Sequence, residues 1–228
     1  MSNTKKLTAL LLAALMLTLT ACGGSSSSGQ STTEAEQTTE EESAAEEETE
    51  EAAESEDASE ETASAGSAEF NGKLQGPFIM TTCGQSTGSV MMHMVATQAG
   101  IDSVDDHTLT SDTFSAGDAK TLVVTTGTSG KGMGAAGTDV NAEIDRCVAL
   151  IETAREAGLT IVCAHVEGMS RRTDSSDQAS IDAIMPLADV IVVVEESDSD
   201  GLFSDYAAAN NIPIIITEDA LGLGEYME

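Results

Sequence analysis

Short apolar runs alternate with amphipathic stretches from residue 70 to the end of the chain. Apolar runs without polar alternation are typical of parallel strands buried on both faces, and apolar positions three or four apart are typical of helices. The strands predicted are 77–83, 120–126, 159–166, 189–195 and 212–217, with a weaker one at 103–110. The helices predicted are 86–98, 139–157, 175–188 and 202–210, followed by a helical tail. The first helix is expected to bury a side formed by Val90, Met91, Met94 and Val95.

This alternation predicts one α/β domain over residues 69–228. Right-handed crossovers then give a three-layer, doubly wound parallel sheet with helices on both faces, flavodoxin-like or Rossmann-like in strand order. About 160 residues form a core large enough to need neither metal nor disulfide.

The first 22 residues have a different pattern. Lys5 and Lys6 precede a mostly apolar stretch, 7–21, that is short for a bilayer-spanning helix and typical of a signal peptide. Residues 19–22, Leu-Thr-Ala-Cys, resemble a bacterial lipobox, so we expect Cys22 to become the lipidated N-terminus. The expected location is the cell membrane, facing outside the cytoplasm at the cell surface or in the periplasm. The alternative is an ordinary secretory signal with an incidental cysteine.

Residues 23–68 are rich in Gly and Ser and then in Glu, and they include no Lys or Arg. Low apolar content and like charges predict a disordered acidic tether, whose role is spacing or, as an alternative, binding cations or a basic partner. The domain itself holds 25 acidic and seven basic residues, a net charge of -18. Such a charge argues against nucleic-acid binding, and the absence of Trp leaves few platforms for stacking bases or flavins.

Ligands of doubly wound sheets bind beyond the carboxyl ends of the strands, so function is sought in four loops there. The first loop, 83–89, leads into a helix whose free N–H groups can hold an anion. The second loop, 127–139, has five glycines in eleven residues around Lys131. The second loop lacks the Walker A spacing, and its literal GxGxxG match lies too far from its strand to favour a dinucleotide. For both loops the alternative is structural, with glycine turns and caps on the helices that follow.

The third loop, 166–177, carries Arg171 and Arg172, and the fourth loop, 195–203, carries Asp200. Three of the seven basic residues of the domain thus fall at one predicted edge, where guanidinium groups suit carboxylates or phosphates. The alternative is that each arginine pairs with a nearby acid, such as Glu167 or Asp177, and only fastens its loop. The fourth loop lacks the Glu that ends a calcium-binding loop.

The four loops resemble an uncharacterised bacterial family, domain of unknown function 6305. The most distinctive part of the resemblance is 131–137, Lys-Gly-Met-Gly-Ala-Ala-Gly, and it extends to Gly84-Gln85-Ser86, to Arg171-Arg172 and to 200–203, Asp-Gly-Leu-Phe. The resemblance covers about 77–228 and implies an exported α/β domain with no known activity.

Catalysis is the alternative to binding. Cys83, at a strand end beside a helix N-terminus, is expected to have a lowered thiol pKa, and His165 ends another strand of the same sheet. Cys147 and Cys163 are expected to be buried apolar residues. His93 and His107 have no ligand spacing, so no zinc site and no cofactor are predicted.

We therefore expect a membrane-anchored module that binds a small anionic or carboxylate-bearing ligand and hands it to a transporter or sensor. Its partners would be that ligand and, through Cys22, the lipid bilayer. The expected ligand-binding residues are Gly84, Gln85, Ser86, Ser129, Lys131, Gly132, Gly134, Arg171, Arg172 and Asp200. The alternatives are a hydrolase or transferase that uses Cys83 or Ser86 with His165, and an interaction domain whose loops are held by salt bridges.

Overall fold

The computed structural model describes residues 71–228, so the expected leader, Cys22 and the tether lie outside the described residues. Six parallel strands form one sheet in the order β2-β1-β3-β4-β5-β6. Their bounds are β1 Phe78–Thr82, β2 Ser103–Asp105, β3 Thr121–Thr125, β4 Thr160–His165, β5 Val190–Val194 and β6 Ile214–Thr217. The predicted doubly wound α/β fold is confirmed, with the flavodoxin-like order extended by a sixth strand.

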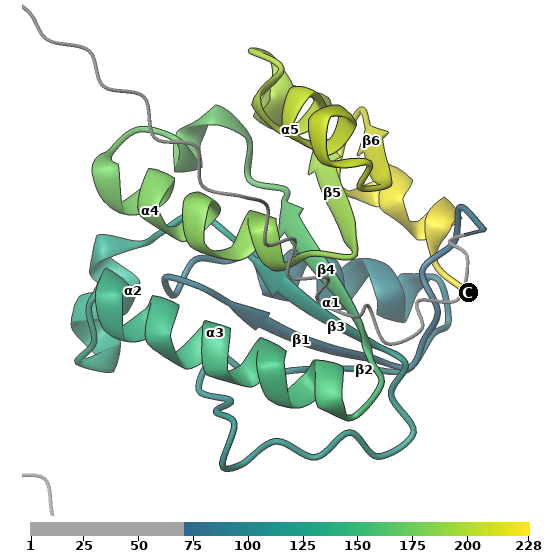
Figure 1. Ribbon diagram of the computed structural model, residues 1–228, viewed down its shortest axis with the longest axis horizontal. Helices are drawn as coiled ribbons and strands as arrows, with labels where there is room; N and C mark the ends of the chain where they lie inside the picture. The colour runs from purple at the N-terminus through teal and green to yellow at the C-terminus, as the bar shows by residue number, and fades with distance from the viewer. Residues whose placement is uncertain (1–70) are drawn as a thin grey trace, which may run out of the picture. The chain divides into compact units, whose positions relative to one another are not determined.

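Helices cover both faces of the sheet (Figure 1). One face carries α1 (Gly88–Gln98) and the 3₁₀ helix η4 (Leu221–Tyr226); the other carries α3 (Val140–Glu156), α4 (Ser175–Ile184) and α5 (Leu202–Asn210). The strand order reverses between β1 and β3, because β1 leads outward to β2 and β3 leads in the opposite direction. The loops after β1 and β3 therefore meet at this reversal point.

The strands are buried on both faces, as their continuous apolar runs indicate. Met80, Val123 and Val162 pack under α1 and η4, and their neighbours Ile79 and Leu122 pack under α3 and α4. Each such side chain contributes about 1.5–3 kcal/mol through its burial. Two apolar layers thus hold the sheet and fix the position of its carboxyl edge.

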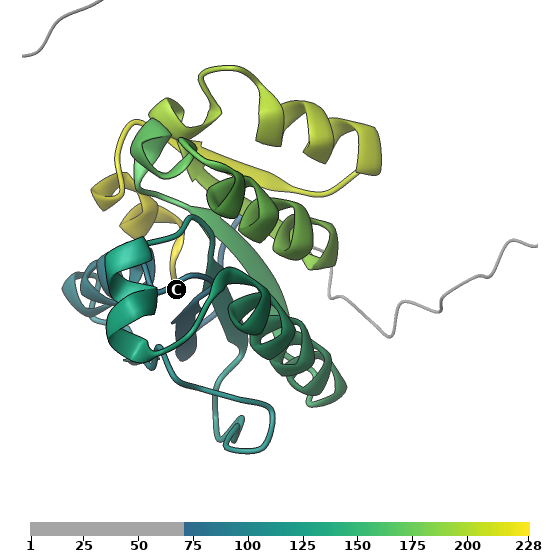
Figure 2. The same cartoon turned by 90° about the vertical axis from the view of Figure 1, so that its left-hand side faces the viewer.

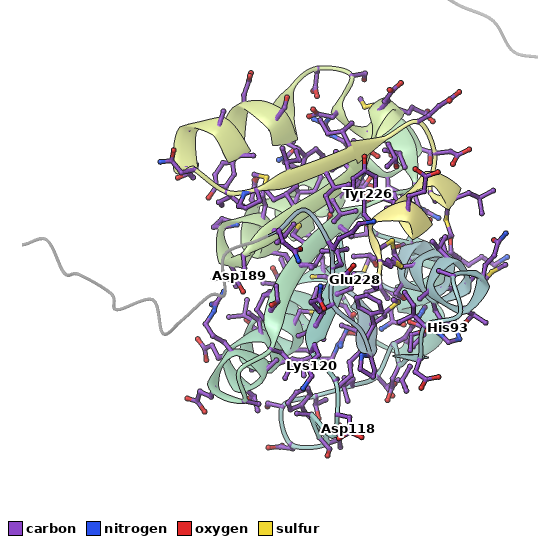
Figure 3. All side chains as sticks on the ribbon, turned by 90° about the vertical axis from the view of Figure 1, so that its right-hand side faces the viewer. His93, Asp118, Lys120, Asp189, Tyr226 and Glu228 are labelled. Carbon is purple, nitrogen blue, oxygen red and sulfur yellow. The ribbon has the colours of Figure 1, made fainter. Side chains whose placement is uncertain are left out.

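The two ends of the described region meet at the opposite, amino edge. Leu74 forms a parallel bridge with Met227, and the Gly76 N–H donates to the Glu228 carbonyl. Lys120 and Asp189, which precede β3 and β5, lie on the same side of the molecule as Glu228 (Figure 3). Among residues 71–228, no helix combines the length and apolar character that crossing a bilayer requires.

Two elements differ from prediction. β2 has three residues rather than eight, because the chain from residue 106 to 120 crosses to β3 without a helix and packs Leu109 and Phe114 on the core. The second loop, predicted to be irregular, contains the helix α2, Gly130–Ala136, which projects at the carboxyl edge (Figures 1 and 2).

The buried side of α1 agrees only in part with the predicted one, since Val95 is buried but Met94 is not. The helix buries Ser89, Met92, Val95 and Ala96, whereas Met94 is 64% exposed. α1 begins close to β3, where a Cβ on Gly88 would lie 3.1 Å from Thr125. Gly88 and Ser89 therefore begin the buried side and Met92 and Val95 continue it, while Met94 faces solvent.

Candidate functional site at the carboxyl edge

The four loops converge at the carboxyl edge, which Figure 2 shows towards the viewer. Gln85 in the first loop pairs with Thr128 in the second as an isolated antiparallel bridge. Arg171 in the third loop donates to the Thr128 carbonyl at 2.8 Å. Arg172 donates to both carboxylate oxygens of Asp200 in the fourth loop, at 2.6 and 2.8 Å. The topology thus brings the expected residues together. Their hydrogen-bond and ion-pair partners determine whether they are available to bind a ligand.

The glycines of the first two loops serve contact between the loops. Gly84 has a φ of +123°, and a Cβ there would lie 2.6 Å from the Thr128 side chain. A Cβ on Gly132 would clash with the carbonyl of Gln85, whereas one on Gly134 would meet open space. Ser129 caps α2, its hydroxyl accepting from the Gly132 N–H at 3.0 Å. Of these expected ligand-binding residues, only Gly134 lacks a structural role in the part of the chain described.

Beneath these loops lies a buried ion pair that sequence reasoning missed. Glu143 accepts hydrogen bonds from the Gly84 N–H, from the Gln85 amide at 3.0 Å and from Arg146 at 2.8 Å. Arg146 also donates to the Leu109 carbonyl at 2.8 Å. The sequence did hold an indication, because Glu143 precedes the apolar Cys147 by four residues and so lies on the buried side of α3.

The N-terminus of α1, where an anion was expected, is occupied by a carboxylate of the protein itself. Glu167 accepts from the Gly88 N–H at 3.0 Å, from the Thr87 hydroxyl at 2.7 Å and from Arg171 at 3.2 Å. Burial alone would raise the pKa of Glu167, but hydrogen bonds from Ser86, Thr87 and Arg171 outweigh it and lower the pKa. The carboxylate is therefore held ionised against the helix.

The three expected cations do not form one positive site. Arg171 is neutralised by Glu167, and Arg172 is paired with Asp200 and lies 5.7 Å from the ring of Phe203. The hydrogen bond from Arg172 lowers the pKa of Asp200 to about 2. Lys131 is exposed on α2 and has no ion pair within residues 71–228. Both arginines therefore fasten loops, as the structural alternative expected.

The Cys83–His165 pair considered for catalysis does not form. β3 lies between the strands of the two residues, and the fully buried Cys83 thiol is free and forms a hydrogen bond with Cys147. That hydrogen bond and burial raise the pKa of Cys83, opposite to the lowering expected. Cys147 and Cys163 are buried, as predicted.

His165 is buried and fully engaged. Its Nδ1 lies 3.0 Å from the Thr126 hydroxyl, its Nε2 lies 3.4 Å from the Gly168 carbonyl, and its ring stacks on Phe203. Burial lowers the pKa of His165 to about 4, so the ring is neutral at pH 7. Ser86, also buried, has its hydroxyl 3.1 Å from that of Thr82. Neither expected nucleophile contacts His165 in the described structure.

The other two histidines lie beside β2. His107 Nε2 lies 3.0 Å from the Ser89 hydroxyl and 3.3 Å from Asp105. Because serine and carboxylate approach the same nitrogen, the ring cannot relay a proton between its two nitrogens as a catalytic triad does. His93 pairs with Ser103. Within residues 71–228, no three His, Cys, Asp or Glu side chains are grouped as a metal ion would need.

A cavity of about 380 Å³ opens at the same edge, at the ends of β4, β5 and β6. Met91, Val166 and Val194 contribute apolar walls, and Glu196, Glu218 and Asp219 contribute carboxylates. We call these three acids the acidic wall. No Lys or Arg of the described residues pairs with the acidic wall, in contrast to Glu167, which lies at the same cavity.

Local backbone places the acidic wall. Gly168 has a φ of +69°, and a Cβ there would lie 2.5 Å from the Glu196 carboxylate, so glycine makes room for that group. Asp219 accepts the Gly222 N–H at 3.0 Å. Sequence reasoning considered four loops and missed Glu218 and Asp219, although their position directly after the sixth strand indicated the same edge.

Comparison with known proteins gives a family and distant structural likenesses. A family model described as Domain of unknown function (DUF6305) matches residues 75–228. No curated protein matches the chain. A GDSL-like lipase from Bacteroides thetaiotaomicron is 14% identical, with a TM-score of 0.32 over 64% of this chain and 68% of that one. A putative acylhydrolase from Bacteroides fragilis is 13% identical, with a TM-score of 0.30 over 65% and 69%. Likenesses this low carry no argument about activity.

Proposed function

The chain belongs to the family Domain of unknown function (DUF6305), and for this member we propose the role of a lipid-anchored extracytoplasmic binding module. The ligand is a small, positively charged molecule held in the cavity at the ends of β4, β5 and β6. The observation that carries the proposal is the acidic wall, whose three carboxylates have no cationic partner in the described structure.

The size and lining of the cavity support binding of a small molecule. Ligand sites are mostly apolar concave surfaces with a few polar groups that fix orientation, and about 380 Å³ is within their usual range. A domain net charge of -18 attracts cations and repels anions, and this reverses the ligand charge expected from the arginines. Binding is favoured over catalysis because Cys83, Ser86 and His165 are buried and satisfied by internal partners.

Ligand binding is tested with propylamine as the cation and with acetate and phosphate as anions. Propylamine should raise the unfolding temperature of the purified protein, since a ligand at 100 times its Kd stabilises by about 2.7 kcal/mol. The triple variant Glu196→Gln, Glu218→Gln, Asp219→Asn should lose this response. Glu152→Gln is the matched control, because Glu152 is an exposed acid of α3 on the opposite face of the sheet. A response to acetate or phosphate alone, or an unchanged triple variant, would overturn the proposal.

The membrane anchor is a separate part of the proposal. It rests on the lipobox-like residues 19–22, with Cys22 separated from the domain by the 46 residues 23–68. Cells fed labelled palmitate should label the parent protein in the membrane fraction. Cys22→Ala should lose the label, and an equally labelled Cys22→Ala protein would contradict lipidation. A transporter or sensor that receives the ligand is proposed as the partner, and cross-linking in intact cells tests it.

A further inference from the structure

We infer that the ligand is an amphiphilic amine, whose charged group meets the acidic wall while its apolar body lies in a neighbouring groove on α1. This inference rests on the proposed function and adds to it the chemical class of the ligand. The groove has a volume of about 730 Å³ and lies between α1 and the segment that joins β6 to η4. We call it the methionine groove, after Met91 and Met94.

The methionine groove exposes large apolar side chains to solvent. Met94 is 64% exposed and Leu221 on its other side is 65% exposed. Burying such side chains is favourable by about 25 cal/mol per Å², so a ligand that covers them gains affinity. Methionine side chains are flexible and polarisable, which lets one surface fit apolar ligands of different shapes.

Met94 is not needed for the core, whereas Met91 also packs partly against it. Met92, Val95 and Ala96 already fill the contact between α1 and the sheet. α1 therefore carries apolar residues on a second side, next to His93, which projects from the helix (Figure 3). The predicted apolar side of α1, with Val90, Met91, Met94 and Val95, is therefore divided: Val95 is buried in the core, whereas Met91 and Met94 line the groove.

The methionine groove continues into the cavity of the proposed site. Met91, Asp219 and Ala220 line both, so the two hollows share a wall. Asp219 thus places a carboxylate where the apolar surface of α1 meets the acidic wall. A molecule with an ammonium group and an attached hydrocarbon would match this order of surfaces.

Charge argues against other occupants. The lining of the groove contains no Lys or Arg, and the domain carries a net charge of -18. A second copy of the domain or an anionic bilayer would bring like charges together. The occupant that fits is therefore cationic at one end and apolar at the other.

The experiment is a titration of the purified protein with propylamine, butylamine, pentylamine and hexylamine, with hexanol and hexanoate as matched neutral and anionic probes. Each added methylene that enters the groove should tighten binding about fourfold. In spectra of ¹³C-methyl methionine, Met91 and Met94 should shift with hexylamine, while the fully buried Met80 should not. Hexanol and hexanoate should bind far more weakly than hexylamine.

A matched pair of variants locates the apolar contact. Met94→Gln should weaken hexylamine binding about fivefold and leave propylamine binding unchanged. Val104→Gln is the control, because Val104 is similarly exposed, at 61%, on β2 outside the groove.

The outcomes separate the inference from the proposed function. Equal affinity for all four amines, with binding lost in the triple acidic-wall variant, would overturn the inference and leave the proposed function standing. Amine binding that is unchanged in the triple acidic-wall variant would overturn both the inference and the proposed function. Hexanol binding as tightly as hexylamine would overturn the assignment of an amine.

Discussion

Two regions of the same sheet edge use charge in opposite ways. At the ends of β1 and β3, Glu143 and Glu167 accept hydrogen bonds from loop N–H groups and from arginines, so these buried carboxylates have internal partners. At the ends of β4, β5 and β6, the acidic wall borders a cavity without a cationic partner in the described residues. The comparison teaches that the glycine-rich loop, which stands out in the sequence, can serve to hold loops together. The less conspicuous acids of the acidic wall remain available for a ligand.

The reason lies in the strand order. Where the order reverses, two loops must pack against each other, which demands glycine at Gly84 and Gly132 and buries backbone N–H groups. Buried N–H groups need acceptors, and the protein supplies carboxylates in the place of a bound anion. No such packing occurs beyond β6, where Glu218 and Asp219 are exposed.

The largest effect that the comparison predicts concerns the buried ion pair. Arg146→Ala should lower the free energy of unfolding by about 3–5 kcal/mol, because it leaves Glu143 buried without its charge partner. Arg155→Ala is the control, since its pair with Asp189 is partly exposed at 3.5 Å and should cost less than about 1 kcal/mol. Urea denaturation measures both, and equal losses would show that the first region is not held by this pair.

The second prediction concerns pH. The folded state lowers the pKa of His165 from 6.5 to about 4, so between these values the unfolded chain binds the proton and the folded chain does not. The free energy of unfolding should therefore fall by about 3 kcal/mol as pH falls from 6.5 to 4. His165→Gln should flatten this dependence in urea denaturation at pH 5 to 6.5. If the free energy of unfolding of the variant depended equally steeply on pH, His165 would not be the source of the pH dependence.

The third and smallest effect distinguishes two glycines of α2. Gly132→Ala should destabilise by about 1–3 kcal/mol, because its Cβ would meet the Gln85 carbonyl. Gly134→Ala should stabilise by up to about 1 kcal/mol, because open space surrounds the position and alanine favours helix. Thermal unfolding of the two variants measures the difference. A stable Gly132→Ala protein would mean that the first two loops are less tightly packed than described.

Much of the fold could be predicted from sequence, because buried parallel strands give unmistakable apolar runs such as that of β5. The four converging loops followed from the same pattern. The partners of Arg171 and Arg172 could not be decided, since Glu167 and Asp200 were among many acids and only the fold brings them within 3.2 Å. The buried side of α1 was predicted only in part, because both of its sides carry apolar residues: Val95 is buried as expected, but Met92 is buried in the place of Met94.

The central claim is that ligand binding belongs to the acidic wall and not to the glycine-rich loops. The most direct measurement is a set of ¹H–¹⁵N spectra of the purified protein during separate titrations with propylamine and with phosphate. The account predicts that propylamine shifts the amide signals of Gly168, Glu196 and Ala220 and leaves those of Gly84 and Lys131 unchanged. Shifts at Gly84 and Lys131 with phosphate, and none at Glu196 with propylamine, would contradict it.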